Sequence, residues 1–110
     1  MIKVSFERQS GLLTKFTYDG HAGYDDYGKD IVCAAVTAQC MMVYNGLNEI
    51  MKIENELVLE EDGGYLSVDI QKASLEKKKE AQILMETLLL GIKAILLQYE
   101  KFIKLIEEEV

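Results

Sequence analysis

The sequence predicts an α+β fold, a two-layer sandwich in which an antiparallel four-stranded sheet packs against two helices in the order β-β-α-β-β-α. Segments of alternating apolar and polar residues occur in two pairs around short turns, which is typical of β-hairpins. Each pair is followed by a long segment with apolar residues three and four positions apart, which is typical of helices. With 110 residues, the chain is expected to form one domain over residues 1–110.

The first hairpin is expected to precede the first helix. Apolar residues take every second position over 2–7, Ser10-Gly11 supplies a turn, and 12–18 returns beside the first strand. A glycine-rich loop follows, and a helix then runs from about Asp30 to about Lys52. One face of the return strand is expected to carry Leu12, Thr14, Phe16 and Tyr18.

The second half of the chain repeats this order of elements. Strands are expected at 57–60 and 65–70 around the turn Asp62-Gly63-Gly64, and Ser74 suits the N-cap of the final helix. That helix is expected to reach about 30 residues, because one apolar stripe contains Leu84, Leu88, Ile92, Ile95, Tyr99, Phe102 and Ile106. The acidic run 107–109 would then be a solvated, frayed helix end.

The final helix is more apolar than one stripe requires. The apolar residues outside the stripe are Ile83, Met85, Leu89, Leu90, Leu96, Leu97 and Ile103. One small sheet and one helix pair cannot cover them all, so we expect a homodimer that buries the surplus. The alternative is a helix that breaks near Gly91 and wraps around the core of a monomer.

Composition and charge limit the partners and the location of the protein. The net charge of −7 argues against direct binding to nucleic acid and favours encounters with basic proteins. The opening residues lack the apolar core of a signal peptide, and the longest apolar stretch, 83–97, is too short to span a membrane. Cys33 and Cys40 lie roughly 10 Å apart along one helix, too far for a disulfide. Free thiols agree with a cytoplasmic location.

Cys33 is expected in the first turn of a helix, where a reactive thiolate is favoured. Backbone amides there have no partners within the helix, and the helix dipole is positive at that end. Both effects stabilise a thiolate and lower a cysteine pKa, and the same amides suit the oxyanion of a tetrahedral intermediate. His21, twelve positions earlier, would complete a nucleophilic pair if it came within hydrogen-bonding distance.

Other polar residues surround this candidate pair. Asp30 and Thr37 lie three positions before and four after Cys33, so the three share one helix face. Asp30 has two candidate roles, as the helix N-cap or as the residue that orients an imidazolium. The loop is expected to be a mobile lid over a substrate, formed by Gly20, Gly23, Tyr24, Tyr27 and Gly28.

The alternative to catalysis is structural. A lone helical cysteine is most often a small buried hydrophobe, and a lone loop histidine is most often solvated. Cys40 lies two turns beyond Cys33 and is expected in the core. One histidine and two helical cysteines make a poor zinc site, so we expect no metal and no cofactor.

Two motifs carry a resemblance to a known family. The triplet Gly20-His21-Ala22 and the segment 30–36, Asp-Ile-Val-Cys-Ala-Ala-Val, resemble the ribosomal-processing cysteine protease family, known as Prp. Its members are homodimeric bacterial endopeptidases that remove a short N-terminal extension from a large-subunit ribosomal protein. The resemblance implies Cys33 as nucleophile, His21 as general base and Asp30 as the family's acidic residue. Where the family usually has serine, this chain has Thr37.

The sequence thus predicts a cytoplasmic cysteine endopeptidase with a Cys33–His21 dyad and a basic ribosomal protein as substrate. The alternative function is a non-enzymatic dimeric ribosome-assembly factor, which binds a basic ribosomal protein without cutting it. A nucleic-acid-binding module is disfavoured by the negative charge.

Overall fold

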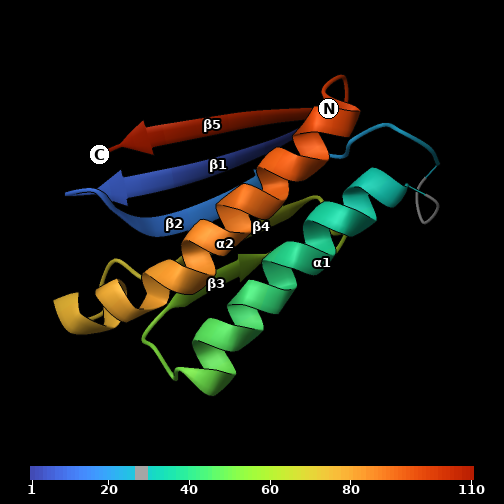
Figure 1. Ribbon diagram of the computed structural model, residues 1–110. Coiled ribbons are helices and arrows are strands. Elements are labelled where there is room, and N and C mark those ends of the chain that lie inside the picture. The colour runs from blue at the N-terminus through green and yellow to red at the C-terminus, as the bar shows by residue number, and fades with distance from the viewer. Residues whose placement is uncertain (27–29) are drawn as a thin grey trace.

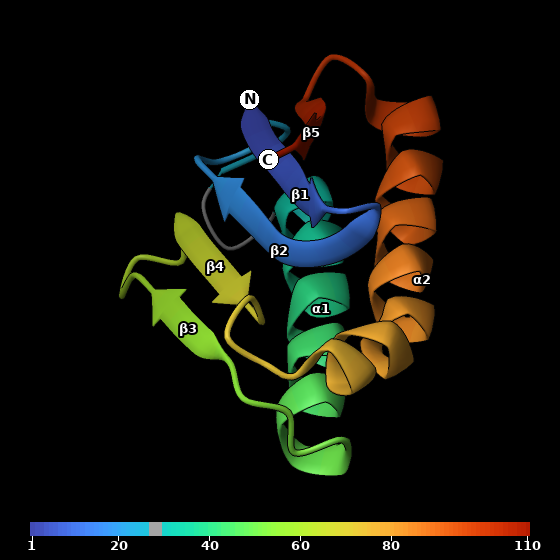
Figure 2. The same ribbon diagram turned by 90° about the vertical axis from the view of Figure 1, so that its left-hand side faces the viewer.

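Two helices cover one face of a five-stranded sheet in the computed structural model, which describes residues 1–26 and 30–110 (Figures 1 and 2). The strands are β1 (Ile2–Gln9), β2 (Leu12–Asp19), β3 (Glu56–Leu59), β4 (Tyr65–Asp69) and β5 (Ile103–Glu109). The helices are α1 (Ile31–Asn45), which continues into a π-helical turn (Gly46–Ile50), and α2 (Leu75–Tyr99). The prediction of a two-layer α+β sandwich is confirmed, while its sheet and its element order are wrong.

The sheet is mixed and contains one strand more than predicted. The strand order is β3-β4-β2-β1-β5, with antiparallel neighbours except for β1 and β5, which run parallel. The order along the chain is therefore β-β-α-β-β-α-β, the π-helical turn being an extension of α1.

The fifth strand replaces the end of the predicted long helix. Helix α2 ends at Tyr99, and the Phe102 amide donates to the Tyr99 carbonyl at 2.9 Å in the turn that follows. Ile103 then pairs with Ile2 on β1 and is 2% exposed. Helical spacing continues through Ile106, but strand formation satisfies the backbone groups on the free edge of β1. The acidic run at 107–109 is consequently part of β5 and no helix end.

Helix α2 is continuous through Gly91, so a break there is wrong. A β-carbon at Gly91 would collide with the side-chain amide of Gln39 on α1. Glycine therefore leaves room for the Gln39 side chain at this point of α2. Met85 and Leu89, part of the predicted surplus, are buried within this chain, whereas Leu90 remains exposed.

A β-bulge changes the expected faces of β2. Glu7 pairs with Lys15 but Arg8 pairs with Leu13, so Thr14 is an extra residue on its strand. The bulge turns Leu13 into the core beside Phe16, although strict alternation assigns these two residues to opposite faces.

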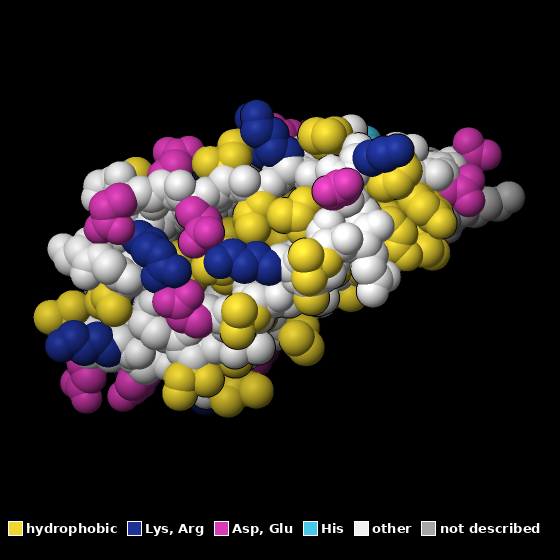
Figure 3. Space-filling model, turned by 45° about the horizontal axis from the view of Figure 1, so that its top comes forward, with side chains coloured by type: hydrophobic (Ala, Val, Ile, Leu, Met, Phe, Trp, Pro, Cys, Tyr) yellow, Lys and Arg dark blue, Asp and Glu magenta, His cyan; other side chains and the backbone are white. Residues whose placement is uncertain are grey.

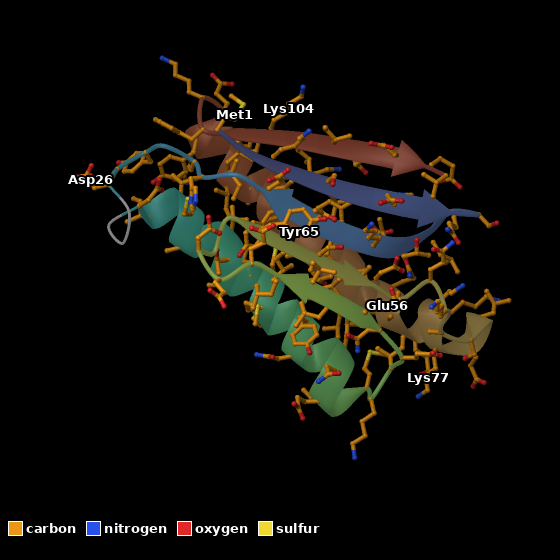
Figure 4. All side chains as sticks on the ribbon, turned by 180° about the vertical axis from the view of Figure 1, so that it is seen from behind. Met1, Asp26, Glu56, Tyr65, Lys77 and Lys104 are labelled. Carbon is orange, nitrogen blue, oxygen red and sulfur yellow. The ribbon has the colours of Figure 1, made fainter. Side chains whose placement is uncertain are left out.

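The core lies between the sheet and the helices and places the first turn of α1 beside the end of β2. Asp26, in the loop before α1, lies at the same end of the molecule as Met1, opposite Lys77 of α2 (Figure 4).

One stretch of the described residues, Ile31–Ile50, is long and apolar enough to cross a membrane, a test that core helices of soluble proteins also pass. Its buried side chains in α1 are Val32, Val36, Cys40 and Val43.

Candidate active site

A cavity of about 420 Å³ opens where the loop after β2, the first turn of α1 and the β3–β4 turn meet. The structure brings five of the predicted site residues to this cavity, although they come from two different segments. The lining residues include His21, Asp30, Cys33 and Thr37, together with Asp25 and Asp62. Gly23 of the predicted substrate loop also lines it.

The Cys33 thiol is partly exposed and accepts a hydrogen bond from the Ala22 backbone amide at 3.0 Å between nitrogen and sulfur. Burial raises the pKa of the Cys33 thiol, the Ala22 hydrogen bond lowers it and the nearby Asp30 carboxylate raises it. The net pKa is raised, contrary to the lowering expected from the helix start. A raised pKa favours the protonated thiol, so a base that takes its proton would assist the attack by sulfur.

Asp30 is the N-cap of α1, as predicted. Its Oδ1 accepts from the Val32 and Cys33 amides at 3.0 Å each, and its Oδ2 accepts from the Tyr24 amide at 2.9 Å. Burial alone would raise the Asp30 pKa, but these backbone hydrogen bonds lower it below its usual value. Asp30 is thus a carboxylate at neutral pH. Its alternative role, orienting an imidazolium, stays a prediction.

The capping by Asp30 corrects one expectation from the sequence. The amides of Val32 and Cys33 already donate to Asp30 Oδ1, and the Ala34 amide donates to the Asp30 carbonyl at 3.0 Å. These first-turn amides were expected to receive an oxyanion, but in the folded chain they have partners. The Asp30 side chain that caps the helix therefore occupies the amides that were expected to bind the oxyanion.

His21 belongs to the loop after β2, and its side chain lies against the β3–β4 turn. The sequence predicted that turn only as part of a hairpin and not as part of the site. A β-carbon on Gly64 would lie 3.1 Å from His21 Nε2 and 3.2 Å from Asp62 Oδ1, so both side chains flank this glycine. The Gly20 amide donates to the Gly64 carbonyl at 2.8 Å, which joins the two segments. Gly20 has a φ of +92°, a conformation that favours glycine.

The remaining predicted residues occupy several positions. Thr37 lies one helical turn beyond Cys33, and its hydroxyl donates to the buried Tyr18 hydroxyl at 3.5 Å. Tyr24 packs edge-on against Tyr99 and Phe102, with ring centroids 5.5 and 5.2 Å away, and does not line the cavity. Its role in covering a substrate stays a prediction.

Two predicted residues of the substrate loop, Tyr27 and Gly28, lie outside the described residues. Cys40 is buried in the core, as expected, and burial raises its pKa to about 12. Within 1–26 and 30–110, the structure holds no group of three or more His, Cys, Asp or Glu side chains suited to a metal ion.

Comparison with known proteins finds relatives that match nearly the whole chain. The family model described as cysteine protease Prp matches residues 1–104. The chain belongs to the cysteine protease Prp family. The ribosomal processing cysteine protease Prp of Bacillus subtilis is 31% identical over 103 residues, covering 91% of both chains. The Prp of Staphylococcus aureus is 29% identical over 98 residues, covering 86% of this chain and 87% of its own.

Solved structures of similar proteins share the fold. The crystal structure of SMU.848 from Streptococcus mutans has a TM-score of 0.86 at 33% identity and covers all of this chain and 96% of that one. S. aureus Prp with a covalently linked product peptide has a TM-score of 0.86 at 27% identity, covering 97% of this chain and 99% of that one. That relative therefore binds a peptide covalently.

Proposed function

We propose that this protein is a cysteine endopeptidase that removes a short N-terminal extension from a large-subunit ribosomal protein during ribosome maturation. The observation that carries the proposal is the cavity in which Cys33, at the start of α1, shares a wall with His21. Family membership and the named activity of its relatives support it. The S. aureus structure with a covalently linked peptide supports a covalent mechanism in that relative.

The proposed mechanism uses Cys33 and His21 as a dyad. His21 takes the thiol proton, and the sulfur electron pair forms a bond to the peptide carbonyl carbon while the carbonyl π pair moves onto oxygen. Collapse of this intermediate restores the carbonyl and breaks the bond to nitrogen. The amine leaves with the proton from His21, and water then hydrolyses the thioester. The raised Cys33 pKa means that the mechanism gains from a base, and His21 is the base that we propose.

The neighbouring residues have supporting roles in this proposal. Asp30 fixes the first turn of α1 and the loop through Tyr24, and Thr37 shapes the cavity wall beyond the nucleophile. Gly20 and Gly23 allow the substrate loop to adopt its backbone conformation, each with a positive φ. No cofactor enters any of these steps.

A basic substrate fits the charge of the protein. Three acidic residues, Asp25, Asp30 and Asp62, line the cavity, and the whole chain carries a net charge of −7. Ribosomal proteins are generally basic and would be attracted over long range. We propose direct recognition of a protein segment, without contact to nucleic acid, in the cytoplasm.

We further propose that the enzyme is a homodimer joined through its helical face. An apolar groove of about 640 Å³ lies between α1 and α2, lined by residues such as Met42 and Leu84. Hydrophobic side chains lie exposed among charged ones on this side of the molecule (Figure 3). Ile50, Ile83, Leu90 and Leu97 are 83, 79, 68 and 86% exposed. We expect light scattering to give the mass of two chains for the parent protein. The Leu90→Lys variant, which places a charge on this face, should give the mass of one chain. A parent protein with the mass of one chain would contradict the dimer.

The experiment for the proposed function presents the natural substrates together. The full chain is incubated with proteins extracted from the large ribosomal subunit of a strain depleted of this enzyme, and new N-termini are identified by mass spectrometry. We expect one shortened protein with the parent and none with Cys33→Ala. Cys40→Ala is the matched control and should cut, because Cys40 is buried away from the cavity. Stable binding without cutting would favour the assembly factor.

A further inference from the structure

Acyl transfer by a cysteine nucleophile needs a donor for the oxyanion, and the structure leaves this role open. In the described residues of the first turn of α1, the amides of Val32, Cys33 and Ala34 are engaged by the Asp30 side chain and carbonyl. Donating to an oxyanion from these positions would require breaking an N-cap that is 8% exposed. A donor elsewhere in the cavity would leave this N-cap intact.

The Ala22 amide lies directly at the nucleophile. Its nitrogen is 3.0 Å from Cys33 Sγ, and its N–H points at the sulfur. In a tetrahedral intermediate, the oxyanion is separated from the sulfur only by the carbon that joins them. A donor that bonds the sulfur is thus placed to reach the oxyanion, for which about 2.7–3.1 Å is the productive distance. Resting on the function proposed above, we propose that the Ala22 backbone N–H is an oxyanion-hole donor.

The transfer of charge during the reaction favours this change of acceptor. In the free enzyme, the Ala22 N–H bonds the sulfur and stabilises its anionic form. When the C–S bond forms, the sulfur becomes thioether-like and is then only a weak acceptor. The negative charge now resides on the former carbonyl oxygen, which is bonded to the same carbon as the sulfur. The same N–H therefore follows the charge from sulfur to oxygen with little movement of the backbone.

The backbone around Ala22 is held on both sides, which is what a preorganised donor requires. Before Ala22, the Gly20 amide bonds the Gly64 carbonyl at 2.8 Å. After it, the Tyr24 amide bonds Asp30 Oδ2 at 2.9 Å. The Ala22 side chain itself is buried at 3% exposure. One tripeptide, Gly20-His21-Ala22, thus supplies both the proposed base and the proposed oxyanion donor.

The test removes the Ala22 N–H and leaves every side chain in place. An ester replaces the amide between His21 and Ala22 in a synthetic segment 1–32, which is ligated at Cys33 to an expressed segment 33–110. The all-amide chain made by the same ligation is the matched control. We expect kcat for cleavage of the extension peptide to fall about 10²–10³-fold in the ester chain. The rate of alkylation by iodoacetamide, which needs a thiolate but forms no oxyanion, should fall by a clearly smaller factor than kcat, because alkylation loses only the hydrogen bond to the sulfur.

The outcomes separate this proposal from the proposed function. An all-amide chain that cuts nothing overturns the peptidase function, and with it this role. Cutting by the ester chain within threefold of the control overturns the oxyanion donor alone. Equal losses in cleavage and alkylation would also overturn it, because the N–H would then serve only the thiolate.

A second measurement tests the same proposal on the unmodified protein, in case the ester-containing chain does not fold. A peptide aldehyde ending at the cleaved bond is added to the ¹⁵N-labelled parent protein, where it forms a hemithioacetal with Cys33. We expect the Ala22 amide proton to shift strongly and the Val32 amide proton to stay near its position. A large shift of the Val32 and Cys33 amides without one at Ala22 would overturn the proposal.

Discussion

Replacing Asp30 with asparagine tests how the helix start and the loop are joined. Asparagine keeps one acceptor oxygen for the Val32 and Cys33 amides but places an NH₂ group where Oδ2 accepts from Tyr24. A buried N–H without its partner costs about 1–3 kcal/mol, and the lost charge at a helix N-terminus costs up to about 1 kcal/mol more. We expect Asp30→Asn to lower the free energy of unfolding by about 1–4 kcal/mol at pH 7, measured by urea denaturation.

The pH dependence of this loss gives the prediction its sign. The Asp30 pKa is lowered in the folded protein, so its stabilising effect is fully present above the unfolded-state pKa of about 3.9. The effect is lost as the pH falls through the lower folded-state value. The gap between parent and variant should therefore narrow only at strongly acidic pH. Asp25→Asn, on an exposed loop residue of the same cavity, is the control and should change stability by less than about 0.5 kcal/mol. An Asp30→Asn variant as stable as this control would refute the role of Asp30.

Three further predictions concern the site and the sheet. Gly64→Ala should lower kcat/KM by displacing the His21 ring, whose Nε2 lies 3.1 Å from the added carbon, while the melting temperature changes little; unchanged cleavage would contradict this position of His21. Iodoacetamide should add one group to the native protein, at Cys33, with a rate that rises with pH around a midpoint above that of a free cysteine; peptide mapping that finds Cys40 modified first would contradict the burial of that thiol. Deleting 103–110 should abolish cooperative unfolding by exposing the edge of β1; a variant that keeps the parent's unfolding curve would show that β5 is dispensable.

The features that the sequence predicted correctly depend on nearby residues. Both hairpins follow from alternation and from short turns, and Asp30 and Ser74 were identified as N-caps because capping involves residues two or three positions away. The Ser74 hydroxyl accepts from the Lys77 amide at 3.2 Å. Such contacts are determined by spacing along the chain, so the sequence contains enough information to predict them.

The features that the sequence missed depend on distant pairing. Residues 103–109 fit both a helix and a strand by spacing, and only the free edge of β1, a hundred positions earlier, favours the strand. The turn at 62–64 joins the site because β2 pairs with β4, which brings Gly64 to Gly20. Local patterns contain no signal for either contact.

The sequence predicted the helix cap and the oxyanion site separately, but not that both would need the same backbone amides. The sequence indicated that Asp30 caps the helix and that first-turn amides suit an oxyanion. Both roles need the same N–H groups, and the folded chain assigns them to Asp30. Likewise, the effect of the helix start on Cys33 is opposed by burial and by the Asp30 charge, which depend on the packed structure.

The most direct measurement is cleavage of the purified natural substrate by the parent protein and by Cys33→Ala. The substrate is the large-subunit ribosomal protein that loses its extension in the extract, and mass spectrometry follows its N-terminus. We predict that the parent removes the extension and forms a transient thioester adduct on Cys33, and that Cys33→Ala folds but leaves the substrate intact. Removal of the extension by Cys33→Ala at the parent's rate would contradict the account.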